Sequence, residues 1–376
     1  MEDLVILGAT CARPPACPSH PGPRRPLTPL LDDETPRSDQ PLDGEWLRAL
    51  SIDLNGRPPF ESERKQWIGR PRAAYVRAAL STEEAWRHWL GEQLYYFMLI
   101  DRFRPVGTGL DELPALLARG AISPRDALHR IALCTSFDLR NPGADTFVTV
   151  IMEQFCGIEV QRATRELEIG KAAYDGGTGV FLGERATSQS DVIRIAVEHK
   201  QAARHLIERE HLRICRAPLS AKGRGKLVKE VHSKPRRLAE VMGEWFVSEA
   251  YEQRVERGAP MENHIWVHTV FVDLSGGLPG PNDVEALRSA LDGLGDPAPL
   301  RSAVVRMLLA SEGTRAPRRA EIGNGGDWVA ETFQRLLGRV PSAHERAAFR
   351  EVAVSGEDGP ETVLYTILTS AEYEKP

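Results

Sequence analysis

The chain has 376 residues, of which 41% are hydrophobic and 27% charged, a balance typical of a soluble globular protein with a sizeable core. A net charge of −5 makes the whole molecule a poor match for a polyanion such as DNA. No stretch approaches about eighteen consecutive apolar residues, so the sequence predicts no membrane-spanning helix.

The first 44 residues differ from the rest in composition. Nine prolines fall between positions 14 and 41, where they remove backbone donors and fix φ too often for regular structure. We therefore expect residues 1–44 to form a disordered tail, with ordered structure beginning near Gly44. Glu2 and Asp3 stand where a secretory signal needs positive charge, so no such signal is predicted.

The five cysteines are odd in number and scattered along the chain. This distribution argues against a disulfide framework and favours a reducing compartment such as the cytoplasm. Cys11 and Cys17 stand close to His20, but they lack the C-x-x-C spacing of a zinc or haem-attachment site. The sequence therefore predicts neither a metal nor a cofactor at this place.

From Trp46 onward the chain can be aligned with itself. The segment WLRALSIDLNGRPP from Trp46 matches WVHTVFVDLSGGLP from Trp266 and WVAETFQRLLGRVP from Trp328 without gaps. A weaker copy begins at Arg213, and part of another follows Ile122. A period of roughly fifty residues is typical of repeat proteins, in which each unit buries its apolar face against its neighbours.

Each copy carries the signals of two helices separated by a sharp turn. In residues 328–337 the apolar side chains recur at helical spacing, which predicts an amphipathic helix. Gly338 suits the left-handed position after a helix, and Glu345 suits the first turn of the next helix. The aligned Gly56 and Gly276 should share this role, so replacing any of the three by Ala should cost about 1 kcal/mol.

The predicted fold class is all-α, because no sustained alternation of Val, Ile and Thr indicates strands. We expect an array of about five to six degenerate helical repeats of ~50 residues behind the tail. The expected domains are N-terminal repeats over 45–141, central repeats over 142–258 and C-terminal repeats over 259–376.

The segment YDGGTGVFLGERATSQSD, residues 174–191, is the best candidate for a ligand loop. Its glycines could let the backbone approach an anion, and Ser188 or Ser190 could cap the helix that follows. The alternative is an irregular loop with a purely structural role. The glycines in question are Gly176, Gly177, Gly179 and Gly183.

A search for chemical motifs finds no G-x-S-x-G, H-E-x-x-H or P-loop pattern, so no catalytic residue is predicted. His264 and His268 stand four apart on a predicted helix and share a face, as a two-histidine metal pair does. No third ligand follows at a usable spacing, so a structural role is expected and no metal site is predicted. Glu208 and His211 have the spacing of a di-iron motif, but that chemistry needs the motif twice.

The strongest charge feature lies between Lys200 and Arg237, where twelve basic residues stand against three acidic ones. This block could be a solvated face, a docking surface for an acidic protein, or a phosphate-binding surface. Aromatic residues are not interleaved with the charges, so stacking on single strands is not predicted. The candidate partner-binding residues are Lys222, Arg224, Lys226, Lys229, Arg236 and Arg237.

The repeat motifs resemble two bacterial families. LSIDLNGRPPFESE, FVDLSGGLPGPNDVEAL and FQRLLGRVPSAHERAAF are similar to uncharacterised domains of planctomycete exported proteins that accompany c-type cytochrome domains. They also resemble the LGR-type helical repeats of bacterial surface proteins, and residues 116–141 are similar to the phycobilisome linker domain. These resemblances imply helical scaffolding and an exported or periplasmic location, although the chain has no C-x-x-C-H haem motif.

The leading expectation is therefore a non-catalytic scaffold or linker that binds acidic protein partners in a larger assembly. One alternative is a nucleic-acid-binding module that uses the basic segment 200–237. A third is an enzyme whose site surrounds the glycine-rich segment 174–191.

Overall fold

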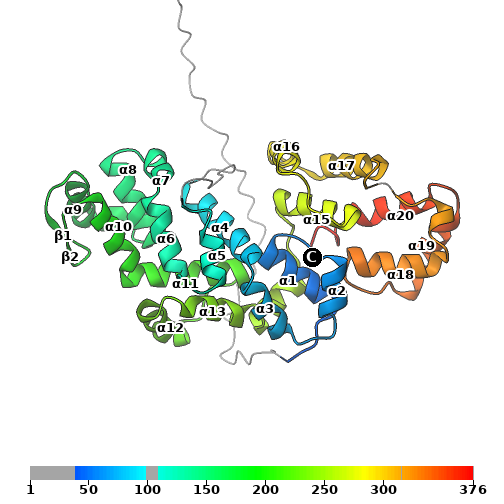
Figure 1. Cartoon of the computed structure of the whole chain (residues 1–376), viewed down its shortest axis with the longest axis horizontal. Coiled ribbons are helices and arrows are strands. Elements are labelled where there is room, and N and C mark those ends of the chain that lie inside the picture. The colour runs from blue at the N-terminus through cyan, green and yellow to red at the C-terminus, as the bar shows by residue number, and fades with distance from the viewer. Residues whose placement is uncertain (1–38, 99–108, 315, 376) are drawn as a thin grey trace, which may run out of the picture. The chain divides into compact units, whose positions relative to one another are not determined.

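A computed structural model describes residues 39–98, 109–314 and 316–375 (Figure 1). Within these residues the expected all-α fold is confirmed, with twenty α-helices and a single two-stranded hairpin. Most of the expected tail, together with Cys11, Cys17 and His20, lies outside the described residues. The number of repeat units stays a prediction.

The helices of the N-terminal part follow one another closely. They are α1 (Gly44–Asn55), α2 (Glu61–Trp67), α3 (Arg72–Leu80), α4 (Glu83–Met98), α5 (Leu113–Ala118), α6 (Pro124–Leu133), α7 (Thr135–Arg140) and α8 (Gly143–Val150). A π-helical turn η1 (Ile151–Phe155) and a 3₁₀ turn η2 (Val160–Arg162) come next.

The central part contains α9 (Thr164–Tyr174), β1 (Gly179–Phe181), β2 (Glu184–Ala186), α10 (Gln189–Glu198), α11 (Lys200–Cys215), α12 (Ala221–Ser233), α13 (Arg237–Trp245) and α14 (Glu249–Arg257). The C-terminal part contains α15 (Asn263–Ser275), α16 (Pro281–Asp292), α17 (Ala298–Ala310), the 3₁₀ turn η3 (Arg319–Glu321), α18 (Gly325–Leu336), α19 (Ala343–Val354) and α20 (Gly359–Leu368). The expected domain boundaries at 141/142 and 258/259 fall between helices, α7 and α8 at the first and α14 and α15 at the second.

The predicted helix ends are confirmed. Gly56, Gly276 and Gly338 have φ of 71°, 72° and 75°, the left-handed conformation that a residue without a β-carbon adopts readily. The weaker copy has Arg216 at the matching place after α11, also left-handed at φ 51°. Four helices therefore end with the same backbone geometry.

The expectation that the three aligned glycines would respond equally to alanine is wrong on steric grounds. A β-carbon at Gly276 would meet nothing within 4 Å, whereas one at Gly338 would lie 2.6 Å from the backbone of Glu45. One at Gly56 would lie 2.8 Å from the ring of His88. Gly338 thus has a second role, because it lets the start of α1 lie directly against the end of α18.

The arginine that follows Gly56 explains why the turn reads Gly-Arg-x-Pro. Arg57 bonds Glu63 in the first turn of α2 at 2.7 Å and Glu84 in the first turn of α4 at 2.6 Å. It thereby ties the end of one helix to the starts of two others. The C-terminal copy repeats the arrangement with Arg339, Glu345 and Glu372, whereas the copy in α15 has Gly277 in place of the arginine.

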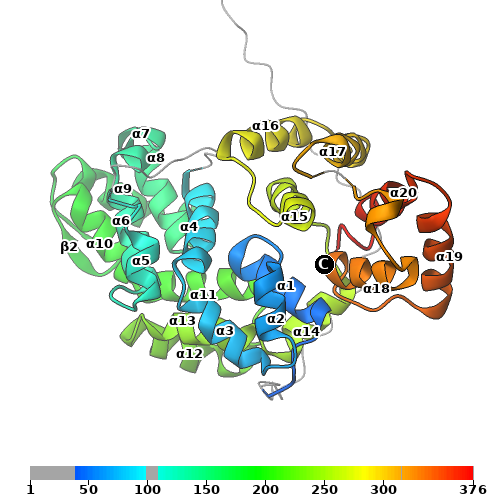
Figure 2. The same cartoon turned by 45° about the vertical axis from the view of Figure 1, so that its right-hand side comes forward.

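Matching helices of the predicted repeat units pack on one another, and we call the two sets of units joined in this way the first and second pair. In the first pair, α3 of the unit that begins with α1 packs on α13 of the unit that begins with α11. In the second pair, α17 packs on α20 in the same way. Figure 2 shows α18, α19 and α20 as neighbouring helices in orange and red.

A buried carboxylate lies at the centre of the second pair. Asp273 of α15 accepts hydrogen bonds from the Tyr373 hydroxyl at 2.9 Å and from Arg48 Nη2 of α1 at 2.8 Å. The side chains of Arg48 and Asp273 are only 5% and 4% exposed. Burial raises the pKa of Tyr373 well above its usual value, so the hydroxyl keeps its proton and donates it to the carboxylate.

The aligned aspartate of the first pair makes matching contacts. Asp53 of α1 accepts from the Tyr251 hydroxyl at 2.7 Å and from Arg254 at 2.6 and 2.7 Å. Tyr251 and Tyr373 each follow a serine by three residues, and each backbone N–H bonds that serine's hydroxyl. The same side-chain types therefore close both pairs.

Helix α1 joins the two pairs. It packs on α3 and α4 within the first pair, and its Arg48 reaches Asp273 in the second. Its Ile52 belongs to the hydrophobic core of the C-terminal helices, which also contains Trp266 and Phe333. Among the described residues, no helix has the length and apolar character needed to cross a bilayer.

The buried ion pair generates a stability prediction. Asp273→Asn keeps the shape of the side chain but leaves the Arg48 charge buried without a carboxylate, which should cost about 3–5 kcal/mol of unfolding free energy. The control is Asp327→Asn, which breaks the exposed pair with Arg346 and should cost under about 1 kcal/mol. Urea denaturation of both variants measures the difference, and equal small losses would contradict the role given to Asp273.

Candidate metal centre

Helices α4 and α15 present two pairs of ligand-type side chains to a common space. His88 and Glu92 lie one turn apart on α4, and His264 and His268 lie one turn apart on α15. All four side chains line a cavity of about 360 Å³, together with Glu262 just before α15. The two pairs come from opposite parts of the chain and meet only in the folded protein.

The local structure explains why these side chains face the cavity. Glu262 directly precedes the first residue of α15, and its side chain makes no capping hydrogen bond to the helix. It is therefore available to the cavity. On α4, His88 lies against Gly56, because only a residue without a β-carbon leaves room for the ring at the end of α1.

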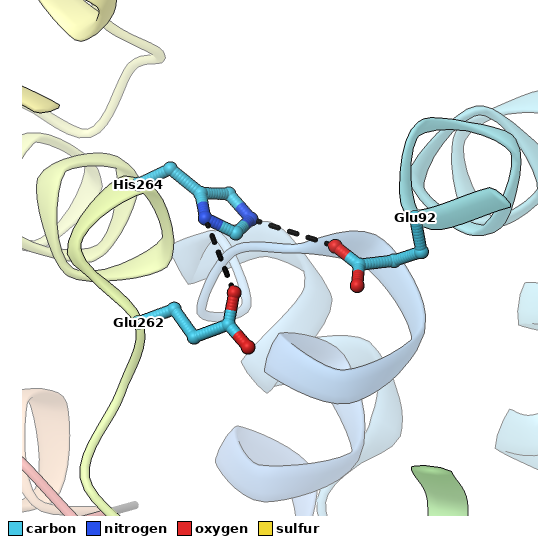
Figure 3. A group of neighbouring side chains, drawn as sticks. All are labelled: Glu92, Glu262 and His264. Atoms are coloured by element: carbon cyan, nitrogen blue, oxygen red, sulfur yellow. Dashed lines mark ion pairs between the residues drawn. The ribbon is translucent and has the colours of Figure 1, made fainter. Parts of the chain in front are cut away.

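Three of the five side chains converge most closely. Figure 3 shows Glu92, Glu262 and His264 pointing toward one another, the first from α4 and the other two from the start of α15. The His264 ring nitrogens lie 3.7 Å from a Glu92 oxygen and 3.6 Å from a Glu262 oxygen. One ligand atom from each residue lies within 4.8 Å of the other two.

The two distances start from different ring nitrogens, Nε2 toward Glu92 and Nδ1 toward Glu262, and one ion would be bound by only one of these nitrogens. Zinc binds nitrogen and oxygen at about 2.0–2.2 Å in tetrahedral geometry, which places two ligand atoms roughly 3.3–3.6 Å apart. With one ligand atom from each residue, the three atoms lie within 4.8 Å of one another, so the side chains would have to move closer together to bind an ion of that size. His88 and His268 line the same cavity and could provide further nitrogen ligands.

The charges around the cluster are mixed, because Arg57, Arg87 and Arg288 line the same cavity as Glu84, Glu92 and Glu262. Burial lowers the pKa of His264 to about 4 and that of His88 to about 3, so both rings are neutral at pH 7 and can donate a lone pair. Burial, and then the Glu262 charge, raise the pKa of Glu92. Two carboxylates thus repel each other beside neutral imidazoles, and a divalent ion would neutralise both charges.

The cluster also borders a second cavity of about 100 Å³. His88, Glu92, Glu262 and His264 line both cavities, and the second one is completed by α1, α11 and α14. An ion held by these residues would therefore be accessible from both sides. Three protein ligands would leave one position of a tetrahedral ion open to a small molecule.

Sequence reasoning set aside His264 and His268 because no third ligand was evident at a usable spacing. The absence of a metal site there stays a prediction. The structure brings Glu262 and Glu92 close to His264, whereas His268 does not belong to this group of three. The usable signal was a second i, i+4 pair of ligand types, His88 and Glu92, on another amphipathic helix. Only the packing of α4 near α15 could show that the two pairs meet.

The glycine-rich segment 174–191 contains the hairpin β1–β2, which corrects the irregular part of the alternative interpretation, whereas ligand binding by this segment stays a prediction. Positive φ at Leu182 and Gly183, 47° and 92°, forms the tight turn that two-residue hairpins favour. β-Carbons at Gly177 and Gly179 would collide with Ala172 and Ile169 of α9, which gives these two glycines a packing role. Gly176 also has positive φ. Ser188 caps α10 as expected, accepting from the Asp191 N–H at 3.1 Å.

Most of the candidate partner-binding cations interact with other parts of the same fold. Arg224 pairs with Glu208 at 3.1 Å, and Lys226 lies 3.9 Å from Glu230. Arg237 pairs with two glutamates on its own helix, and Arg236 donates to the Ala121 carbonyl at 2.8 Å. Lys222 and Lys229 are exposed on α12. The segment therefore presents less unpaired charge than its composition suggests.

The Glu208–His211 spacing does not build a metal site in the structure. Glu208 pairs with Arg204 and Arg224 at the surface, whereas the buried His211 ring lies 2.9 Å from the Ala217 carbonyl and packs edge-on against Trp245. The two side chains serve different neighbours, although they are one turn apart.

Neither a family model, nor a curated protein, nor a solved structure matches the chain. The resemblance to planctomycete exported domains, LGR-type repeats and phycobilisome linkers therefore stays a prediction.

The pairing within the basic segment generates a prediction for nucleic acid. We expect duplex DNA to bind only weakly at about 0.15 M salt, because few of the cations are free to replace counterions on phosphates. Fluorescence anisotropy with a labelled duplex measures the affinity. Sub-micromolar binding that is lost in Lys226→Glu/Lys229→Glu, but kept in the distant control Lys65→Glu/Arg87→Glu, would make nucleic-acid binding the better assignment.

Proposed function

We propose that the protein is a non-catalytic scaffold that binds one divalent transition-metal ion between α4 and α15. The observation that carries the metal is the convergence of Glu92, Glu262 and His264 on one point from two distant parts of the chain. In this proposal the ion ties the N-terminal helices to the C-terminal helices. The repeat surface then holds protein partners in a fixed arrangement.

The ligand types select the class of metal. Imidazole nitrogen together with carboxylate oxygen suits Zn²⁺, Co²⁺ and Ni²⁺, whereas Mg²⁺ and Ca²⁺ prefer oxygen ligands alone. Zinc tolerates the irregular geometry of such a site because its filled d shell imposes no preferred arrangement. We therefore propose Zn²⁺ as the natural ion, with Co²⁺ as a spectroscopic substitute.

Two surface features support the scaffold part of the proposal. A groove of about 1140 Å³ runs between α2 and α18, and Ile68 and Val340 expose 52% and 63% of their surfaces along or near it. Charged side chains from both helices border the groove, an arrangement found where protein segments bind. The exposed lysines of α12 offer a separate surface for an acidic partner.

The metal is tested by titration of the purified full chain with Co²⁺ after chelator treatment. We expect one equivalent to bind with visible absorption bands of a low-symmetry site, and Zn²⁺ to displace it. Glu92→Gln and His264→Ala should each weaken binding at least about tenfold, because each removes one of three close ligands. The matched control His344→Ala removes an exposed histidine of α19 and should leave binding unchanged.

The proposal is contradicted if Co²⁺ does not bind, or if it binds with the same affinity in Glu92→Gln and His264→Ala as in the unaltered chain. Circular dichroism of each variant shows that it is folded. A weakening confined to the α4 and α15 variants supports the bridge between the two parts of the chain.

A further inference from the structure

The smaller cavity beside the metal ligands carries an unusual set of charges. Three arginines, Arg213, Arg216 and Arg254, line it together with three carboxylates, Asp53, Glu92 and Glu262. Arg254 already uses donors within the fold, because it donates hydrogen bonds to both oxygens of Asp53 and to the Ile214 carbonyl. The other two arginines have donors available to a ligand.

Arg216 is the most informative of these residues. Its backbone has φ of 51° at the helix end where the aligned units have glycine. A side chain with a β-carbon is strained in this conformation. The residue is exposed and lines the cavity, and no hydrogen bond or ion pair joins its guanidinium to another side chain in the described part of the chain. Arg216 therefore combines a strained backbone conformation with a position at this cavity.

Arg213 lies on the same side of the cavity, one turn before Arg216 on α11. Its Nε donates to the buried Glu210 at 2.9 Å, which fixes the direction of the planar group. A guanidinium has five donors, so an oriented arginine of this kind can still offer nitrogens to an oxyanion.

The charge balance makes anion binding depend on the metal. With neutral histidines, the three arginines and three carboxylates that line the cavity have no net charge. A divalent ion on Glu92, Glu262 and His264 would raise the total to +2. The same ion would have a coordination position open to the cavity.

We propose that the metal-loaded cavity binds a phosphate-type oxyanion, with one oxygen on the metal ion and others bonded by Arg216 and Arg213. This inference rests on the proposed metal site and names the ligand that completes it. The cavity of about 100 Å³ has room for a group of the size of inorganic phosphate or the terminal phosphate of a monoester.

The experiment uses the full-length chain loaded with one equivalent of Co²⁺. Inorganic phosphate and phosphoserine are titrated separately while the visible spectrum of the metal is recorded. We expect a saturable spectral change, because an oxygen of the anion replaces solvent on the ion. The ligand with the tighter dissociation constant identifies whether free phosphate or a monoester is preferred.

Arg216→Gly is the decisive variant, because glycine suits the left-handed position and removes only the guanidinium. We expect Co²⁺ affinity to stay the same and phosphate affinity to fall at least tenfold. The matched control Lys229→Ala removes an exposed cation on α12 and should change neither quantity.

The possible outcomes separate the two proposals. If Co²⁺ fails to bind, the metal site is refuted and the anion site with it. If Co²⁺ binds but phosphate and phosphoserine leave its spectrum unchanged, the metal site stands and the anion site is refuted. Equal phosphate affinity in Arg216→Gly and the unaltered chain, or equal affinity with and without Co²⁺, also refutes the inference.

Discussion

The arrangement of the described helices depends on a buried ion pair between Arg48 of α1 and Asp273 of α15. Two charges that are each about 95% removed from solvent are stable only when their partners are well placed, so this contact fixes α15 relative to α1. Helix α4 also packs on α1, so its position is fixed relative to the same helix. The facing positions of α4 and α15 follow from these two contacts, and the candidate metal ligands lie on those helices.

The same chemistry closes each pair of repeat units. An aspartate near the end of the first helix accepts a tyrosine hydroxyl and an arginine, as Asp53 does in one pair and Asp273 in the other. The origin of the arginine differs, because Arg254 comes from within the first pair whereas Arg48 comes from the neighbouring pair. The Arg254–Asp53 contact therefore lies within the first pair, whereas the Arg48–Asp273 contact joins the first pair to the second. The proposed ion would add a second connection between them, at α4 and α15.

Several features could be predicted from the sequence because they depend on residues close together in the chain. The left-handed glycines after α1, α15 and α18 follow from the Gly-x-x-Pro spacing, and the cap of α10 follows from Ser188. The hairpin after α9 was missed, because its strands are three residues each and its turn uses Leu182, a residue that seldom adopts positive φ.

The candidate site could be predicted only in part. The pair His264 and His268 was visible as an i, i+4 spacing, and so was the pair His88 and Glu92. Their meeting depends on long-range packing that no local pattern encodes. The strain at Arg216 was equally hidden, since an arginine directly after α11 looks in the sequence like one more member of the basic segment.

The central claim is that one metal ion bridges α4 and α15. The most direct measurement is anomalous diffraction at the zinc edge from crystals of the full chain grown with one equivalent of Zn²⁺. The account predicts one strong anomalous peak with ligand atoms of Glu92 and His264 at about 2.0–2.2 Å. Crystals with no such peak, or with zinc held by residues elsewhere, would contradict it.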